Sequence, residues 1–224
     1  MLRDELAAMG KTPSRQTFGN DVPDSHRFWL VMRRTTGDEE MVGTVAGRLD
    51  NIERDPRQFL ERQLERYWCN EGNVRLHLPE RLEQQLLGPS VYLGDLFFIP
   101  EITGDRQKTF AFVHAAYAYA FARWPEARSL YVYVRMADYL ERNPVYGFTS
   151  AVALNAVEWS VPQAYRSPYE CLVTLTRSDF LANMEALLRC PELFEELPTR
   201  RPRDVWASVA SPQPVPLALS LIHI

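Results

Sequence analysis

Cysteine is scarce in this chain, and the three residues present lie far apart. Cys69, Cys171 and Cys190 are odd in number and form no Cys-x-x-Cys pair. Disulfide frameworks and structural zinc sites are usually marked by closely spaced cysteines, and the sequence carries neither signature. We therefore expect reduced thiols, a cytoplasmic protein and no metal site.

Long apolar runs and a strong charge of either sign are also missing. No apolar run reaches the ~18 residues that indicate a membrane span. The first residues, MLRDELAAMGKT, include acids and lack the apolar core of a secretory signal. The formal net charge is −4, and general nucleic-acid binding needs a basic face. We expect neither a membrane span nor a nucleic-acid partner.

The overall composition is that of an ordinary globular protein, with 46% hydrophobic and 24% charged residues in 224. We expect an N-terminal helix and loop over residues 1–25, and a single domain over 26–197 with an insertion at 53–90. Residues 198–224 contain SPQPVP and end in LALSLIHI. This tail is too rich in proline for regular structure, and its end resembles a translational read-through.

Strand-like and helix-like segments follow each other along the domain. The expected strands are 27–34 and 40–49, joined by a turn at 36–38, then 91–99, 129–135, 152–159 and 169–176. The expected helices are 2–9, 55–68, 79–87, 105–124, 137–142 and 177–190, the last capped by Ser178 or Asp179. This order predicts an α+β fold with a mixed central sheet flanked by helices.

The segment from strand 91–99 to helix 105–124 is the most informative. A strand, a helix and a further strand at 129–135 predict two parallel neighbouring strands. Ligands in such sheets lie beyond the carboxyl ends of the strands, and a helix N-terminus there favours an anion. Arg106 and Lys108 add positive charge at the same place. We expect a phosphate-bearing ligand, against the alternative of a solvated helix start.

The chain resembles the GNAT superfamily of acyl-CoA-dependent N-acyltransferases over about residues 26–176. The resemblance rests on the order of elements, on the strand YLGDLFFIPE, and on Gly147-Phe148. A Gly-Phe pair usually closes the helix after the fifth strand in that family. The resemblance implies a GNAT-like fold with an inserted helical segment between the third and fourth strands. It also implies acetyl-CoA or another acyl-CoA as co-substrate.

The pyrophosphate loop of the family is only partly present. It normally reads Arg or Gln, two residues, Gly, one residue, then Gly or Ala. Aligned on Pro100, this pattern falls on residues 103–108 and keeps a glycine only at Gly104. The side chains at 106 and 108 either crowd the phosphates or contact them. The CoA-binding residues that the resemblance implies are Phe97, Phe98, Ile99, Gly104, Asp105, Arg106, Gln107, Lys108 and Thr109.

Three residues are candidates for proton transfer. Asp95 matches a position where many relatives carry a carboxylate, which acts as general base toward an amine. The alternative is a structural carboxylate paired with an arginine. The family's tyrosine that protonates the thiolate lies four residues before Gly-Phe, where this chain has Asn143. Tyr139 and Tyr146 are the available substitutes, unless they simply pack in the core.

The resulting hypothesis is an enzyme that moves an acyl group from acyl-CoA to an amine of a small molecule or peptide, as a monomer or homodimer. Two alternatives stay open. A catalytically inactive ligand-sensing or interaction module fits the eroded loop, and a filled cleft between the parallel strands would favour it. A synthase with a long-chain donor would need an apolar tunnel lined by Phe97, Phe112 or Trp124. The insertion 53–90 either covers the acceptor pocket or adds a packing layer.

Overall fold

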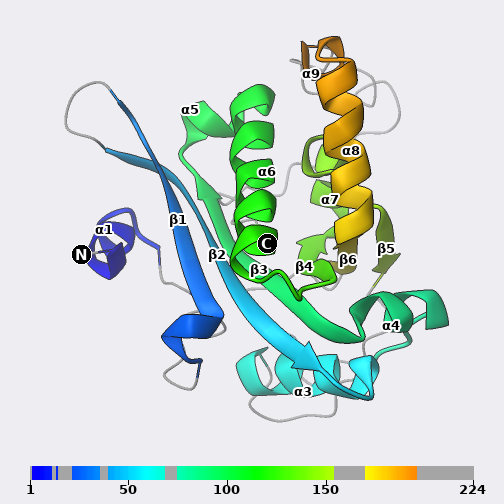
Figure 1. Cartoon of the computed structure of the whole chain (residues 1–224). Helices are drawn as coiled ribbons and strands as arrows, with labels where there is room; N and C mark the ends of the chain where they lie inside the picture. The colour runs from blue at the N-terminus through cyan, green and yellow to red at the C-terminus, as the bar shows by residue number, and fades with distance from the viewer. Residues whose placement is uncertain are drawn as a thin grey trace, which may run out of the picture.

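The computed structural model describes residues 2–11, 14, 22–35, 40–68, 75–153 and 170–195. These residues form a six-stranded sheet in the order β1-β2-β3-β4-β6-β5 (Figure 1). The strands are β1 (Arg27–Arg33), β2 (Met41–Ile52), β3 (Gly88–Phe98), β4 (Ser129–Arg135), β5 (Ser150–Ala153) and β6 (Glu170–Thr176). The helices are α1 (Leu2–Ala8), the 3-10 turn η1 (Asp24–His26), α3 (Pro56–Trp68), α4 (Glu80–Leu86), α5 (Pro100–Thr103), α6 (Arg106–Arg123), α7 (Met136–Tyr146), α8 (Arg177–Arg189) and α9 (Glu192–Glu195).

The sheet is mixed. β3 and β4 are parallel, and the other neighbouring strands pair antiparallel. The predicted α+β class, and the predicted parallel pair on either side of the long helix, are confirmed. The order of hairpin, strand, long helix, strand, helix and closing antiparallel pair is the GNAT-like order that the sequence indicates.

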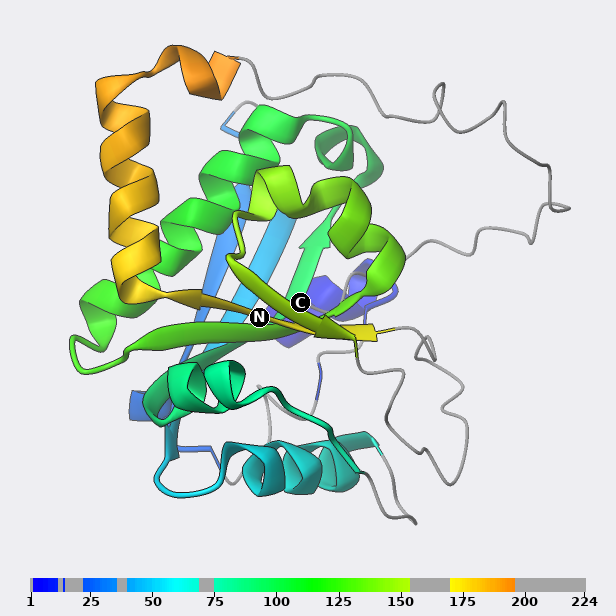
Figure 2. The same cartoon turned by 90° about the vertical axis from the view of Figure 1, so that its right-hand side faces the viewer.

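Helices cover both faces of the sheet (Figure 2). On one face, α6 and α8 pack on the strands through Val113, Tyr117 and Phe180, together with Val145 from α7. On the other face, α3 and α4 pack on Tyr92, Tyr131 and Leu172 of three strands through Leu60, Leu64 and Leu86. Within the insertion 53–90, α3 and α4, which lie between β2 and β3, therefore add a packing layer on this face of the sheet.

A buried polar network lies under that second layer. The Arg48 guanidinium donates to both carboxylate oxygens of Asp50 at 2.8 and 2.9 Å. The Tyr131 hydroxyl donates to Asp50 at 2.6 Å, and Arg48 lies 5.1 Å from the Tyr92 ring centroid. Burial, followed by the Asp50 carboxylate, raises the pKa of Tyr131 well above its ordinary value. Because each charge is paired, the network is compatible with the buried face of the sheet.

Helix α7 is longer than predicted. The sequence predicts a helix that ends before Asn143-Pro144, whereas α7 continues through Pro144 to Tyr146. Proline lacks the N–H that a helix interior uses, but here it lies in the last turn. Gly147 at φ 70° closes the helix, and its N–H donates to the Asn143 carbonyl at 2.7 Å. A left-handed glycine is a common helix stop.

Other boundaries also differ. Residues Pro100–Thr103, expected in a loop, form the short helix α5. The cap of α8 is Thr176, whose hydroxyl accepts the Asp179 N–H at 3.1 Å, in place of Ser178 or Asp179. The predicted turn at 36–38, most of strand 152–159 and the tail 198–224 lie outside the described residues. The predicted domain bounds accordingly stay predictions. No helix in the described ranges has the length and apolar character to cross a membrane.

Candidate functional site

Strands β3 and β4 pair only where they begin. The register joins Ser90–Tyr92 to Ser129–Tyr131. Farther on, β3 continues along β2 and β4 continues along β6. The two strands therefore diverge toward α5 and α7, as Figure 1 shows. The sheet opens at the carboxyl ends of its parallel strands, which is where open α/β sheets bind ligands.

Asp95 lies at an irregularity on one side of this split. Residues 44–46 of β2 are opposite residues 94–97 of β3, so β3 contains one extra residue. Asp95 takes φ 53°, a left-handed conformation that few residues other than Gly, Asn and Asp adopt. Its carboxylate is buried, and Oδ1 accepts the Ser14 backbone N–H at 3.0 Å. The predicted general base thus sits in a bulge, in contact with the N-terminal segment.

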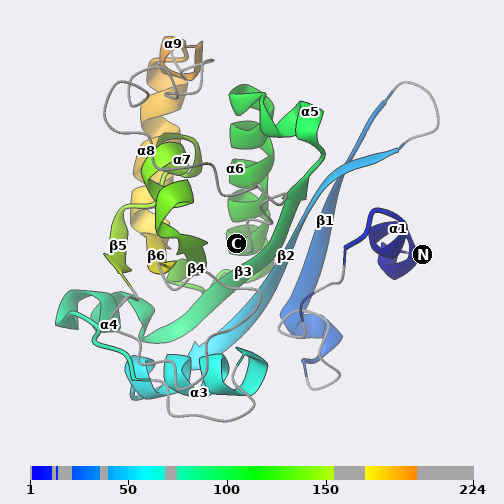
Figure 3. The ribbon, with the colours of Figure 1, turned by 180° about the vertical axis from the view of Figure 1, so that it is seen from behind.

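That segment also contacts the next outward-facing residue of β3. The Lys11 ammonium lies 4.7 Å from the centroid of the Phe97 ring, and burial lowers the Lys11 pKa from its ordinary value. The Arg33 guanidinium pairs with Glu5 of α1 at 2.8 Å. Figure 3 shows α1 beside β1 in the view from behind, in which α3 is also in front. The N-terminus therefore covers part of the face opposite α6.

The last residues of β3 differ in their backbone hydrogen bonds. The Ile99 N–H donates to the Val42 carbonyl of β2 at 3.0 Å. Because N–H directions alternate along an antiparallel strand, the Phe98 N–H points away from β2, toward the split. The Phe98 ring packs edge-on against Phe112 at 5.5 Å. Of these two residues, Phe98 has the N–H that faces the diverging strands.

The turn after β3 is compact. α5 occupies residues 100–103, and Gly104 follows with φ −79°, a conformation open to any residue. A Cβ placed on Gly104 would meet no atom within 4 Å. Gly104 is thus not required by local strain, and the space beside its backbone is open.

Asp105 caps α6. Its Oδ1 accepts the Lys108 backbone N–H at 3.0 Å, and Oδ2 pairs with the Lys108 Nζ at 2.8 Å. These contacts with Lys108, and a smaller one with the Gln107 N–H, hold the pKa of the Asp105 carboxyl below its ordinary value. The positive end of α6 already has an internal carboxylate, so a phosphate group would bind beside Asp105 or displace it.

A narrow cleft lies between the start of α6 and the end of α7. It is lined by Thr103, Gly104, Arg106, Thr109, Glu141, Arg142 and Val145. Its volume of about 30 Å³ is roughly that of one or two water molecules. Three of the predicted CoA-binding residues, Gly104, Arg106 and Thr109, meet here. The cleft as it stands is much too small for a cofactor, since ligand pockets usually exceed about 300 Å³.

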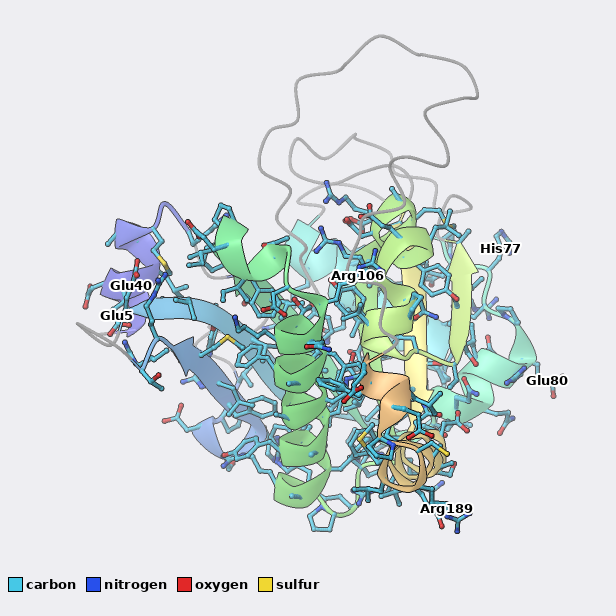
Figure 4. All side chains as sticks on the ribbon, turned by 90° about the horizontal axis from the view of Figure 1, so that it is seen from above. Glu5, Glu40, His77, Glu80, Arg106 and Arg189 are labelled. Atoms are coloured by element: carbon cyan, nitrogen blue, oxygen red, sulfur yellow. The ribbon has the colours of Figure 1, made fainter. Side chains whose placement is uncertain are left out.

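The cleft is positively charged. Arg106 is half-buried, and in the part of the chain that the structure describes its guanidinium makes no hydrogen bond or ion pair. Figure 4 shows Arg106 between the start of α6 and α7. Arg142 adds a second guanidinium from α7, and its Nε lies 4.0 Å from the Asp138 carboxylate behind it. The lining itself carries two guanidiniums and the carboxylate of Glu141, beside a helix N-terminus, and this favours an anionic ligand. Arg142 is not among the residues predicted from the sequence, because no sequence pattern shows which side of α7 faces α6.

The candidate tyrosines lie in α7 behind the cleft. Tyr146 is fully buried, and its hydroxyl has no hydrogen-bond partner among the described residues. Burial raises its pKa well above the ordinary value, and the nearby Arg142 guanidinium opposes that shift. Tyr139 is half-buried against the core. Neither residue lines the cleft.

Asn143, which stands where the family has its tyrosine, holds the Gly-Phe pair. Its Nδ2 donates to the Phe148 carbonyl, and its Oδ1 accepts the Phe148 N–H, both at 3.2 Å. A Cβ on Gly147 would lie 3.2 Å from His114 Nε2. The Asn143 side chain therefore closes the end of α7.

His114 packs against the same corner from α6. Its Nδ1 lies 3.0 Å from the Phe110 carbonyl, so that nitrogen carries the proton, and its ring stacks on Phe110 at 3.7 Å. Burial lowers the His114 pKa to about 4. His114 is therefore a neutral core residue.

A larger cavity of about 320 Å³ lies on the other face of the sheet. It is lined by Asp55, Arg57, Gln58, Glu61, Arg75, Leu76 and His77. Its charges are of both signs, and it lies away from the split. Neither cavity is lined by Phe97, Phe112 or Trp124. The Trp124 Nε1–H instead donates to the Ser25 carbonyl at 3.2 Å, at the far end of α6. These two cavities give no support to a long-chain donor.

No protein-family model matches the chain, and no curated protein matches it. The structure is similar to that of Arabidopsis thaliana NAA60 in complex with acetyl-CoA, with 14% identity and a TM-score of 0.48, over 79% of this chain and 93% of that one. The structure of the same protein in complex with a bisubstrate analogue is 12% identical with a TM-score of 0.46. That match covers 78% of this chain and 90% of that one. A chimera of spermidine N-acetyltransferase SpeG from Vibrio cholerae and hSSAT is 12% identical with a TM-score of 0.41. That match covers 80% of this chain and 82% of the chimera. These likenesses concern the fold alone.

Proposed function

We propose that the protein is an N-acyltransferase that moves an acetyl or other acyl group from acyl-CoA to an amine of a small molecule or peptide. The observation that carries this proposal is the split between β3 and β4. A bulged carboxylate, Asp95, lies on one side of it, and the positive cleft of Arg106 and Arg142 lies at its open end. A thioester with a phosphate-bearing tail fits that distribution of groups.

In this proposal the CoA pyrophosphate lies at the start of α6. Arg106 and Arg142 neutralise the phosphates, and the open backbone at Gly104 allows close approach. Thr109 lines the same cleft, while Asp105, Gln107 and Lys108 belong to the first turn of α6 beside it. The pantetheine arm follows residues 97–99 into the split, as the GNAT resemblance implies. Binding requires α7 to move away from α6, because the present cleft is too small.

The chemical step needs a base, an oxyanion donor and an acid. Asp95 takes a proton from the acceptor ammonium, directly or through water, and the amine nitrogen attacks the thioester carbonyl. The Phe98 N–H donates to the oxyanion that forms. The C–N bond then forms fully and the C–S bond breaks. Tyr146 or Tyr139 gives a proton to the leaving thiolate. A phenol is protonated at neutral pH, and burial raises the Tyr146 pKa further.

A second function is favoured by two particular observations. The cleft is nearly filled, and Asp105 already caps the helix where a phosphate is expected. Both fit a GNAT-like module that senses a ligand or binds a partner without catalysis. The two functions differ in whether CoA is released.

Release of free CoA from acetyl-CoA separates these two functions. The assay supplies a polyamine, a lysine peptide and a peptide with a free N-terminus as acceptors. We expect thiol release with at least one of them, lowered by about 10²-fold or more in Asp95→Asn, because general base catalysis contributes that much. Asparagine tolerates the φ of 53° at this position, so the variant tests chemistry rather than folding. Binding of acetyl-CoA without release on any amine would establish the non-catalytic module.

A further inference from the structure

A lysine of this chain lies at the acceptor side of the proposed site. The Lys11 ammonium is over Phe97, and three residues later the Ser14 N–H contacts the Asp95 carboxylate. Asp95 and Phe97 are two positions apart in β3, within the bulge opposite residues 44–46 of β2. The ε-amine therefore lies over the side chain two positions from the proposed base, on a segment that also contacts that base.

The position of Lys11 is fixed by its backbone. The Lys11 N–H donates to the Leu6 carbonyl at 2.8 Å, and the Leu6 side chain is buried. The ion pair between Glu5 and Arg33 holds the same helix beside β1. The approach of Lys11 to β3 is thus part of a packed arrangement of α1, and it involves several independent contacts.

The surroundings of Lys11 differ from those of Lys108. Lys11 is half-buried against an aromatic ring, and within the described ranges its amine forms no ion pair. Lys108 is exposed, and its Nζ is paired with the Asp105 carboxylate at 2.8 Å. Partial burial lowers the pKa of the Lys11 amine, which increases the fraction of free base. The free base is the nucleophilic form.

We propose that Lys11 is an internal acceptor, so that acyl-CoA bound in the split acylates the Lys11 ε-amine of the same chain. This inference rests on the proposed function. The deprotonated Nζ attacks the thioester carbonyl, the C–N bond forms and the C–S bond breaks. The proton that the amine loses passes to Asp95, and a proton reaches the thiolate to give free CoA. The product is an Nε-acyl-lysine, formed once per chain.

The sequence offers an internal control for this proposal. Lys11 and Lys108 are the two lysines of the chain, so peptide mass spectrometry can follow each of them. The full-length protein is incubated with acetyl-CoA and no added amine. We expect acetylation of Lys11 at least about tenfold faster than that of Lys108, because a positioned acceptor reacts as an intramolecular group. The half-time should not depend on protein concentration. In urea the two lysines should react at similar rates.

Two variants separate the site from its surroundings. Lys11→Arg keeps a cation over Phe97 and should abolish the fast acetylation. Asp95→Asn should slow acetylation of Lys11 and leave that of Lys108 unchanged. A binding titration with acetyl-CoA accompanies each experiment.

The outcomes are distinguishable. If acetyl-CoA binds but Lys11 and Lys108 react equally in the folded chain, the inference is wrong and the proposed function stands. If Lys11 reacts faster but Asp95→Asn has no effect, the assignment of Asp95 in this step is overturned. If acetyl-CoA does not bind at all, both the inference and the proposed function fail.

Discussion

At the scale of single residues, His114 links stability to pH. Its pKa is about 4 in the folded protein and roughly 6.5 in an unfolded chain. Well above pH 6.5 the residue is neutral in both states, so it adds no pH dependence there. As the pH falls from 6.5 toward 4, only the unfolded chain gains the proton, and the free energy of unfolding decreases by up to about 3 kcal/mol.

The variant His114→Phe tests this linkage. Phenylalanine preserves the stack on Phe110 and cannot titrate, so the urea midpoint should decline less between pH 6.5 and 4.5 than in the wild type. The exposed His77 provides the matched control, and His77→Gln should retain the wild-type profile. An unchanged decline in His114→Phe would show that other groups cause the acid sensitivity.

Single-residue roles were only partly predictable. The strand pattern places Asp95 correctly in β3, since Gly94 and the apolar neighbours indicate a strand with one polar position. Its contact with Ser14 joins residues 81 positions apart in the sequence. Local sequence patterns do not predict contacts between such distant positions. For the same reason the sequence did not single out Lys11. Arg142 was missed because helical periodicity gives spacing along α7 but not the direction in which α7 faces.

At the scale of elements, two glycines at helix ends should respond oppositely to alanine. Gly147 has φ 70°, and a Cβ added there would lie 3.2 Å from His114 Nε2, so Gly147→Ala should lower the free energy of unfolding by about 1–2 kcal/mol or more. Gly104 has an ordinary φ and open space, so Gly104→Ala should leave stability unchanged or raise it by a few tenths to about 1 kcal/mol. Chemical denaturation measures both.

The two glycine variants also test the proposed acetyl-CoA site. The methyl group of Gly104→Ala would occupy space beside the backbone of the cleft and should weaken acetyl-CoA binding despite normal stability. Gly147→Ala should keep its affinity in the fraction that is folded. Equal destabilisation by both substitutions would contradict the helix ends described here.

The bounds of helices and strands were predicted well where the hydrophobic periodicity is strong. They were predicted poorly where a tertiary contact determines where the element ends. Helix 105–124 and strand 129–135 agree with α6 and β4 to within one residue at each end. α7 extends through Pro144 because Gly147 and Asn143 complete its last turn. The short helix α5 follows a proline that is favourable at a helix start. The β3–β4 pairing ends at Tyr92 and Tyr131, and β3 bulges against β2 beyond that point. Strand propensity reveals neither feature.

At the scale of the whole molecule, two packing layers leave one end of the sheet open. The α3–α4 layer covers the joined parts of β3 and β4, and α6 and α7 flank their diverging ends (Figures 1 and 2). The cleft therefore forms between α6, which joins β3 to β4 along the chain, and α7, which directly follows β4. In the proposed function, ligand entry requires these two helices to separate.

The central claim is that this open end binds acyl-CoA, and a thermal-shift titration with acetyl-CoA tests it most directly. At ~100 times its dissociation constant the ligand should stabilise the fold by about 2.7 kcal/mol. We predict that Arg106→Gln loses most of this shift. Arg189→Gln, which changes an exposed arginine far from Arg106 (Figure 4), should keep it. The absence of any shift in the wild type, or an equal shift in both variants, would contradict the account.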